Sequence, residues 1–279
     1  MSEAIEREKP DRNNQLAEAI AKSERPPRPS PLAATMAFAT RTLLRIKHIP
    51  EQMFDVTVFP IIFLLMFTYL FGGAISGSTG EYLQFLLPGI LVMTVAQITM
   101  YTGLDLNNDI RKGIFDRFRT LPIWLPSALV GSLLVDTVRY TMASTIMIIL
   151  GLILGFRPEG GFLGVVAAVG LILLFCFSLS WIWTTLGLIM RSDKSLMMVS
   201  MMVLFPLTFV SNVFVNPETL PSFLEAFVDI NPISLLVNAV RGLMHGSVTA
   251  GDIGWVFFVS AIITIIFAPL TMYLYRNKK

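Results

Sequence analysis

Side chains that could perform catalysis or bind a metal ion are few and far apart in this sequence. The chain has two histidines, His48 and His245, and one cysteine, Cys176, which lies in an apolar run. Because protein metal sites usually combine three or four such ligands, we expect no metal site. The sequence also lacks the Gly-x-x-x-x-Gly-Lys-Ser/Thr phosphate loop, the Gly-x-Ser-x-Gly elbow and the His-Glu-x-x-His motif. We therefore expect neither an enzyme nor a chain that binds ATP itself.

Charged side chains gather in one stretch between two apolar runs, Asn107–Pro122, which reads Asn-Asn-Asp-Ile-Arg-Lys-Gly-Ile-Phe-Asp-Arg-Phe-Arg-Thr-Leu-Pro. An ionised side chain costs about 2.5–3.5 kcal/mol at the centre of a bilayer, so this stretch must lie in water or at the membrane surface. Apolar residues recur every four positions, at Leu106, Ile110, Ile114 and Phe118, and this pattern predicts an amphipathic helix. The helix should end before Pro122.

Two roles fit this helix. In the first, it lies flat on the bilayer and is held there by its apolar side. In the second, the apolar side rests on the protein itself, and Phe115, Asp116, Arg117 and Arg119 contact a cytosolic partner. The helix carries both signs of charge, whereas an anchor for anionic lipids needs only positive charge.

A charged pair, Asp136 and Arg139, lies inside a long apolar run. Their spacing of three places both on one side of a helix, which predicts an ion pair within the membrane. The pair either fixes helix packing or faces a wet cavity used for gating or for substrate.

The composition indicates a membrane protein. Hydrophobic residues make up 54% and charged residues 14% of the chain, whereas soluble proteins have about 25% charged residues. The net charge of +2 is too small to indicate a nucleic acid partner. We predict an all-α polytopic protein with six transmembrane helices, each near the ~20 residues that one crossing needs. They lie at about Val56–Phe71, Phe85–Leu104, Ala128–Leu154, Phe162–Met190, Leu196–Val215 and Trp255–Tyr275.

The basic residues predict the orientation. If both termini are cytosolic, twelve Lys and Arg residues flank the spans on the inner side, and only Arg157 and Arg241 lie on the outer side. Because short cytosolic loops carry the excess of Lys and Arg, we expect a multi-pass protein of the cytoplasmic membrane with cytosolic termini and a cytosolic Asn107–Pro122 stretch.

Two segments precede the first span. Residues 1–31 alternate charges, end in four prolines and have no apolar run to bury, so we expect a disordered cytosolic tail. Residues 32–52 carry apolar residues on one side and basic residues on the other. This pattern predicts an interfacial helix whose basic side lies against anionic lipid headgroups.

Residues 216–251 are apolar in patches but interrupted by Pro217, Pro221, Pro232 and Gly242. Two short helices, at about Pro221–Val228 and Pro232–Met244, fit this pattern. Each is shorter than the ~17 residues of a full crossing. We therefore expect a re-entrant pair on the outer side, with its broken backbone covered by protein.

Two motifs resemble a known family. The segment Gly113–Pro122, Gly-Ile-Phe-Asp-Arg-Phe-Arg-Thr-Leu-Pro, resembles the permease subunits of type-2 ATP-binding-cassette exporters, and among them the daunorubicin/doxorubicin-resistance branch. The resemblance covers about Leu32 to Lys279. The second motif is similar to the segment before that family's last span: Phe214-Val215, Leu220-Pro221, Asn231-Pro232 and Ala239-Val240-Arg241-Gly242.

The resemblance implies a transmembrane domain over residues 32–279, six spans, and a pair of permeases that is a homodimer or a heterodimer. It also implies separate ATP-binding subunits, which would hold ATP and Mg. It makes residues 32–52 a connecting helix, residues 105–122 a coupling helix, and residues 216–251 an extracellular re-entrant region. The implied contacts with the ATP-binding subunit are Ile114, Phe115, Asp116, Arg117, Phe118 and Arg119.

We therefore expect the permease subunit of an ATP-driven exporter that moves amphipathic drugs or lipid-like molecules out of the cell. The alternative is an autonomous channel or an ion-coupled secondary transporter. Membrane lipids would surround the spans. Candidate residues for a substrate-lining surface are Phe67, Gln97, Met201, Phe205 and Asn212.

Overall fold

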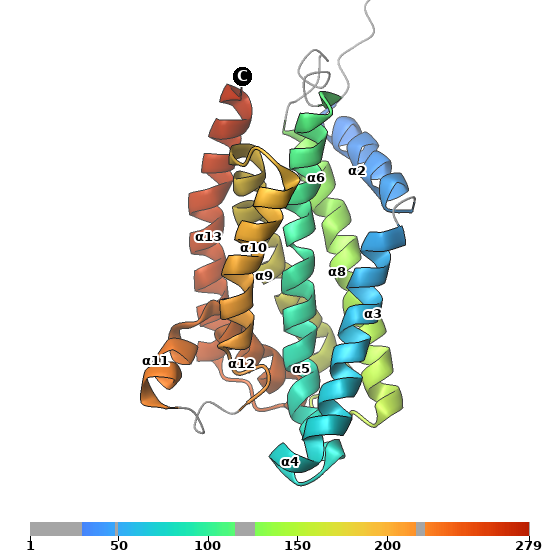
Figure 1. The fold of residues 1–279 in the computed structure, drawn as a ribbon, viewed down its shortest axis with the longest axis vertical. Helices are drawn as coiled ribbons and strands as arrows, with labels where there is room; N and C mark the ends of the chain where they lie inside the picture. The colour runs from blue at the N-terminus through green and yellow to red at the C-terminus, as the bar shows by residue number, and fades with distance from the viewer. Residues whose placement is uncertain (1–29, 48–49, 115–125, 216–220, 279) are drawn as a thin grey trace, which may run out of the picture.

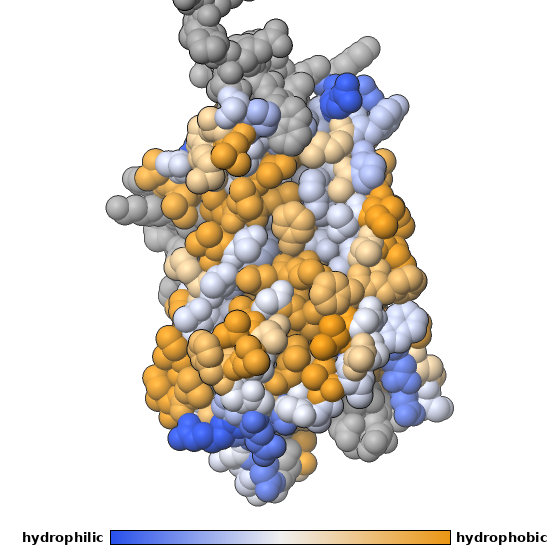
Figure 2. Space-filling view, turned by 180° about the vertical axis from the view of Figure 1, so that it is seen from behind, coloured by the Kyte–Doolittle hydropathy of each residue, from blue (hydrophilic) through white to orange (hydrophobic). Residues whose placement is uncertain are grey.

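The computed structural model describes residues 30–47, 50–114, 126–215 and 221–278, and every regular element in these ranges is a helix. Most of the tail expected at 1–31 and the expected partner contacts from Phe115 to Arg119 lie outside the described residues. The longest helices run along one axis and form an elongated bundle (Figure 1). Figure 2 shows apolar side chains over most of its middle and the most hydrophilic ones toward its two ends.

Five helical segments among the described residues are long and apolar enough to cross a membrane: Thr57–Ile75, Thr79–Arg111, Ser127–Leu154, Gly161–Ile189 and Ala250–Asn277. A further helix, α10 (Asp193–Phe209), has 17 residues, the lower limit for a crossing, and lies along the bundle axis (Figure 1). The prediction of an all-α polytopic membrane protein is confirmed.

The first span is built from three consecutive helices. Helix α3 (Pro50–Met66) continues into a π-helical turn, η1 (Phe67–Phe71), and then into α4 (Gly72–Ser76). Single π-turns of this kind widen an α-helix locally and recur at functional sites. Three phenylalanines of this span follow one another along one side, with ring centroids 4.5 Å apart for Phe59 and Phe63 and 5.5 Å apart for Phe63 and Phe67.

The second span is longer than predicted. Helix α5 (Thr79–Ile98) is mostly buried at the centre of the bundle, and helix α6 (Met100–Arg111) follows after an irregular turn at Thr99. At 1.5 Å per residue the 33 residues Thr79–Arg111 extend about 50 Å, well beyond the ~30 Å of hydrocarbon. The second span was predicted to end at Leu104, which was too early. The polar residues after Leu104 continue the helix to Arg111 because they have hydrogen-bonding partners within the protein.

The remaining long helices are α8 (Ser127–Leu154), α9 (Gly161–Ile189) and α13 (Ala250–Asn277). Helix α10 ends at Phe209, six residues before the predicted end at Val215. Its last carbonyls, of Leu207 and Val210, accept hydrogen bonds of 2.8 Å from the side chain of Asn231. The predicted end was wrong because the apolar run continues past the point where the helix is capped.

The two short helices predicted between α10 and α13 are present. They are α11 (Ser222–Ile230) and α12 (Pro232–His245), and the pair bends by 75° between them. Asn231 begins α12 by accepting a hydrogen bond from the backbone N–H of Ile233 at 2.9 Å, as expected for an N-cap residue. Both helices lie at the end of the bundle that also holds α4 (Figure 1).

Helix α2 (Pro31–Lys47) lies beside α8 at the opposite end of the bundle, where the C-terminus also lies (Figure 1). It buries Ala34, Thr35 and Thr42. Of the basic side expected to lie against headgroups, Arg41 pairs with a carboxylate of α6 and keeps a side chain that is 38% exposed, while the side chains of Arg45 and His48 lie outside the described residues. Among the described side chains of α2, the apolar residues Leu32, Met36, Leu43 and Leu44 are exposed.

Candidate functional site

Helix α6 leads into the charged stretch and packs its apolar side against the bundle. Leu106 and Ile110 contact a small buried cluster of Leu129, Leu188 and Tyr275, which come from α8, α9 and α13. These two residues belong to the apolar repeat of the predicted amphipathic helix. Of the described residues on its apolar side, Leu106 and Ile110 therefore rest on the protein.

The predicted helix over residues 105–122 is interrupted. Helix α6 ends at Arg111, and Gly113 has a φ of +66°, a left-handed conformation that commonly terminates helices and that glycine adopts without steric cost. Residues 105–111 thus belong to the long second span. The four-residue repeat did not reveal this break because Gly113 lies between two of its members, Ile110 and Ile114.

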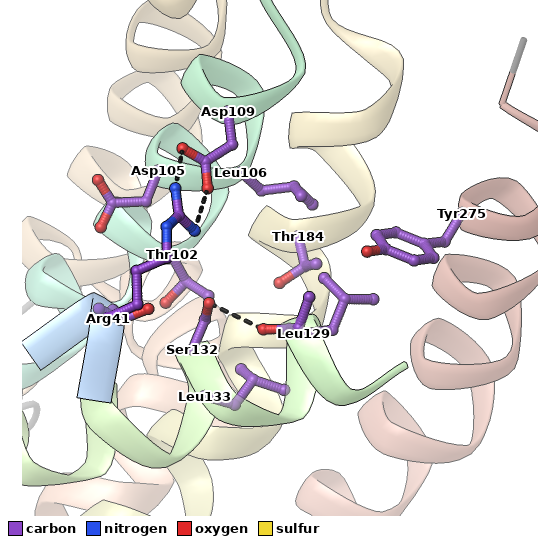
Figure 3. Close-up of a pocket in the computed structure, with 12 residues that line it drawn as sticks. Arg41, Thr102, Asp105, Leu106, Asp109, Leu129, Ser132, Leu133, Thr184 and Tyr275 are labelled. Carbon is purple, nitrogen blue, oxygen red and sulfur yellow. Dashed lines mark hydrogen bonds and ion pairs between the residues drawn. The ribbon is translucent and has the colours of Figure 1, made fainter. Parts of the chain in front are cut away.

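Polar side chains of α6 connect it to α2. Arg41 donates two hydrogen bonds to Asp109, from Nη1 to Oδ2 at 3.2 Å and from Nη2 to Oδ1 at 3.3 Å (Figure 3). Such two-point pairing fixes the relative orientation of both groups. The sequence offered no signal for this contact because the residues are 68 positions apart.

Other polar side chains connect α6 to α8 through a buried cluster. Arg139 is 8% exposed and donates to Asp136 Oδ1 at 3.0 Å and to Asp105 Oδ2 at 3.1 Å. Thr102 donates to the second oxygen of Asp136 at 2.7 Å. The predicted pair of Asp136 and Arg139 is present, and α6 supplies two partners that sequence reasoning missed. Buried charges need this dense set of hydrogen bonds to offset their desolvation.

A small cavity lies next to this cluster. It has a volume of about 30 Å³ and is lined by polar side chains, such as those of Arg41, Thr102 and Asp105, together with the apolar side chains of Leu106, Leu129 and Leu133 (Figure 3). A volume of this size holds water but not a drug-sized ligand, which needs roughly 300–1,000 Å³. The cluster therefore connects helices, and the cavity beside it is too small to hold such a ligand.

Helix α6 also holds the C-terminal end of α9 and the start of α10. Asn107 donates to the carbonyls of Gly187 and Met190 at 2.8 and 2.7 Å, and so caps α9. Arg111 pairs with Asp193 at 3.0 Å. Helix α6 is thus tied by polar contacts to α2, α8, α9 and α10.

Of the five substrate-lining candidates, two share a cavity. Gln97 and Met201 line a space of about 190 Å³ between α3, α5, α6 and α10, together with Phe59, Pro60, Thr94, Ile98, Met100, Tyr101 and Met197. Asn212 lies elsewhere, buried, and donates to Asn238 at 2.5 Å.

The other two candidates, Phe67 and Phe205, do not line that cavity but belong to one chain of aromatic contacts. Ring centroids are 4.7 Å apart for Phe67 and Phe214, 5.4 Å for Phe214 and Phe209, and 4.2 Å for Phe209 and Phe205. This chain crosses from the first span to α10. Three aromatic residues near these candidates were missed. Phe209 lies one helical turn after Phe205 and contacts it, and Phe214 contacts Phe67 in space. Phe59 lines the cavity beside Gln97.

No cluster of three or more His, Cys, Asp and Glu side chains in the described ranges is arranged to hold a metal ion.

Comparisons with known proteins agree with a membrane transport subunit. Residues 33–245 match the family described as ABC-2 type transporter. The chain is 51% identical, over 95% of its length and 94% of the relative, to the daunorubicin resistance ABC transporter permease protein DrrB1 of Streptomyces coeruleorubidus. It is 22% identical to the probable doxorubicin resistance ABC transporter permease protein DrrC of Mycobacterium tuberculosis, over 86% and 88% of the two chains. The chain belongs to the ABC-2 type transporter family and is a multi-pass membrane permease subunit of an ABC exporter, in which a separate protein hydrolyses ATP.

Proposed function

We propose that this permease exports amphipathic drugs or lipid-like molecules, and that force from the ATP-binding subunit enters through residues Ile114 to Arg119. The observation that carries the proposal is the set of contacts that ties α6 to α2, α8, α9 and α10. Ile114 is the first residue of that segment, and the described part of the chain ends there before it resumes at residue 126. The partner would hold ATP and Mg, and movement of its docking surface would displace α6 with the helices bound to it.

The drug-like substrate class is supported by the 51% identical relative, whose name refers to daunorubicin resistance. Met, Phe and Gln side chains around the cavity between α3, α5 and α10 suit varied apolar ligands with a few polar groups. At about 190 Å³ the cavity is smaller than the ~300–1,000 Å³ of drug sites. A site large enough for a drug would therefore form in one of two ways. A second permease, either another copy or a related chain, would complete it, or the helices would separate and enlarge the cavity.

Both termini would be cytosolic. The positive-inside count supports this orientation. In addition, α2, the end of α6 and the C-terminus lie at one end of the bundle (Figure 1), so the basic segments expected on the cytosolic side are on the same side of the protein.

Replacing Arg117 with glutamate tests the coupling role. The reversed charge would weaken docking to the ATP-binding subunit, so we expect export to fall to background while the permease still inserts in normal amounts. Export into vesicles and co-purification of the two subunits would be measured together. Arg157→Glu is the control, because Arg157 is exposed at the other end of the bundle and its side chain bonds to backbone carbonyls.

Two outcomes would contradict the proposal. One is full export by the Arg117→Glu variant with undiminished co-purification. The other is substrate flux through vesicles that contain the permease alone, because an autonomous channel or ion-coupled carrier needs no ATP-binding partner.

Replacing Met201 with tryptophan tests the substrate lining. The larger ring would fill the cavity beside Gln97, so we expect the substrate concentration for half-maximal transport to rise several-fold. Met198→Trp is the matched control, because Met198 lies on the same helix, is exposed and does not line the cavity. Equal transport constants in the two variants would exclude this cavity from the substrate path.

A further inference from the structure

Helix α5 contains a proline, Pro88, in its buried interior. Proline has no backbone N–H, and its ring crowds the carbonyl four residues earlier. The carbonyl of Gln84 therefore lacks the donor that residue 88 would otherwise supply within the helix. Because an unpaired carbonyl away from water costs free energy, this carbonyl needs a donor from another part of the protein.

Helix α12 supplies that donor. The ring nitrogen Nε2 of His245 lies 3.0 Å from the carbonyl oxygen of Gln84. Since a carbonyl oxygen only accepts hydrogen bonds, Nε2 carries the proton. One turn earlier on the same side of α12, Arg241 donates from Nε and Nη2 to the next carbonyl of α5, that of Phe85, at 3.3 and 3.1 Å. We call these bonds, from His245 and Arg241 to the carbonyls of Gln84 and Phe85, the α5–α12 clamp.

Arg241 also holds the part of the chain that follows α10. Its Nη2 donates to the carbonyl of Asn212 at 3.0 Å, and its Cζ lies 3.9 Å from the centre of the Phe85 ring. The same segment touches α5 directly after the proline, because a Cβ at Gly89 would lie 2.8 Å from the backbone oxygen of Val213. One arginine thus joins α5, α12 and the residues after α10 where the proline interrupts α5.

The clamp lies on a helix that leads, at its other end, to the proposed coupling segment. Helices α5 and α6 together form the second span, Thr79–Arg111, and Ile114 begins the coupling segment beyond it. Prolines are the usual sites at which helices bend, so a force on this span should bend α5 most easily at Pro88. A helix carbonyl points toward the residue four positions later. Bending at Pro88 therefore displaces the carbonyls that α12 binds.

We propose that α5 bends at Pro88 during export and that the α5–α12 clamp makes α12 follow this movement. The inference rests on the proposed function, because the force is the one that enters from the ATP-binding subunit. Arg241 and His245 are positioning residues, since they bind main-chain carbonyls and do not line the cavity beside Gln97. Through them the second span moves α12 at the end of the bundle that also holds α4 (Figure 1).

The distance between two spin labels tests whether α12 moves. The permease is assembled with its ATP-binding subunit and reconstituted in phosphatidylcholine vesicles, in a Cys176→Ser background. Cysteines for the labels replace Leu70 in the first span, which is 68% exposed, and Asn238 on α12, which is also exposed. The distance is measured without nucleotide and with nucleotide trapped by vanadate. We expect it to differ between these two states.

Removing the clamp should abolish this difference. We expect the same distance in both states for the Arg241→Met/His245→Leu protein. Arg157→Met is the matched control and should keep the difference, because the Arg157 side chain also bonds to backbone carbonyls at this end of the bundle, but only to those of its own turn and of the end of α8. If force does not enter through the coupling segment, Arg117→Glu keeps the difference. If the clamp is wrong, the Arg241→Met/His245→Leu protein keeps it.

A rescue variant separates transmission of movement from helix stability. Glutamine at position 245 retains an N–H that can reach the Gln84 carbonyl, so His245→Gln should match the unsubstituted protein. His245→Leu should lower both the thermal unfolding midpoint and the distance difference. Adding Pro88→Ala supplies the missing N–H within α5, so it should restore the midpoint but not the distance difference. The Pro88→Ala/His245→Leu protein carries the test even where His245→Leu alone does not assemble.

Three results would overturn the proposal. An unsubstituted complex with the same distance in both states would show that α12 is stationary. A His245→Gln protein that behaved like His245→Leu would show that the hydrogen bond to Gln84 transmits nothing. Recovery of the distance difference together with the midpoint in the Pro88→Ala/His245→Leu protein would mean that His245 only completes the hydrogen bonding of α5.

Discussion

Replacing Arg139 with alanine is expected to destabilise the permease by about 3–5 kcal/mol, because breaking a buried ion pair leaves a charge without compensation. Asp136 would keep only the hydrogen bond from Thr102 among its described contacts, and Asp105 would lose its ion pair with α8. A loss of this size is a large fraction of the 5–15 kcal/mol that stabilises a typical protein. The thermal unfolding midpoint of the purified complex, and export at equal protein, would both fall.

Lysine at position 139 should not restore stability. The guanidinium of Arg139 contacts Asp136 through Nη1 and Asp105 through Nη2, and a lysine ammonium is a compact point charge without this planar fork. Arg41→Ala is the matched comparison, because the side chains of Arg41 and Asp109 are 38% and 16% exposed, so we expect this pair to contribute less than the more deeply buried contacts of Arg139.

A double variant separates the ion pair from general damage. Combining Arg139→Met with Asp136→Asn removes the more buried of the two carboxylates that Arg139→Met alone would leave without their partner. Its loss of stability should therefore be smaller than the sum of the two single losses. Additive losses, or an Arg139→Ala protein as stable as the unsubstituted one, would show that the cluster does not hold α6 against α8.

The spans were predictable because each is an apolar run close to the length of one crossing, and because Asp136 and Arg139 are near enough in sequence to share a helix side. Their partners on α6 were not predictable. Asp105 and Thr102 come from another span, 34 positions from the residues they bind. Nothing in local periodicity indicates which two helices will face each other.

Helix ends were the least predictable part of the fold, since they depend on capping groups supplied from elsewhere. Helix α10 ends where the amide of Asn231 reaches its carbonyls, and Asn107 closes the end of α9 in the same way. Both amides come from distant segments. An apolar run therefore predicts that a helix exists but not the residue at which it ends.

Replacing Gly103 with alanine is expected to cost about 1–3 kcal/mol, the usual cost of overpacking a well-packed interior. A Cβ at Gly103 would lie 2.3 Å from the backbone oxygen of Trp183, and one at Gly187 would lie 2.5 Å from the backbone oxygen of Gly103. Helices α6 and α9 approach closely only because both positions lack side chains. Separating them would also strain the 2.7 Å hydrogen bond from Trp183 Nε1 to Thr99.

Gly170→Ala is the control for helix propensity, because Gly170 lies within α9 and a Cβ there would have no atom within 4 Å. We expect it to be neutral or slightly stabilising, since alanine is favoured over glycine in helices by about 1 kcal/mol. Thermal unfolding of the assembled complex would compare the two variants directly. Because α6 carries the proposed coupling movement, Gly103→Ala should also lower the amount of substrate exported per ATP hydrolysed. A Gly103→Ala protein that matched Gly170→Ala in both measurements would mean that this close contact supports neither packing nor transmission.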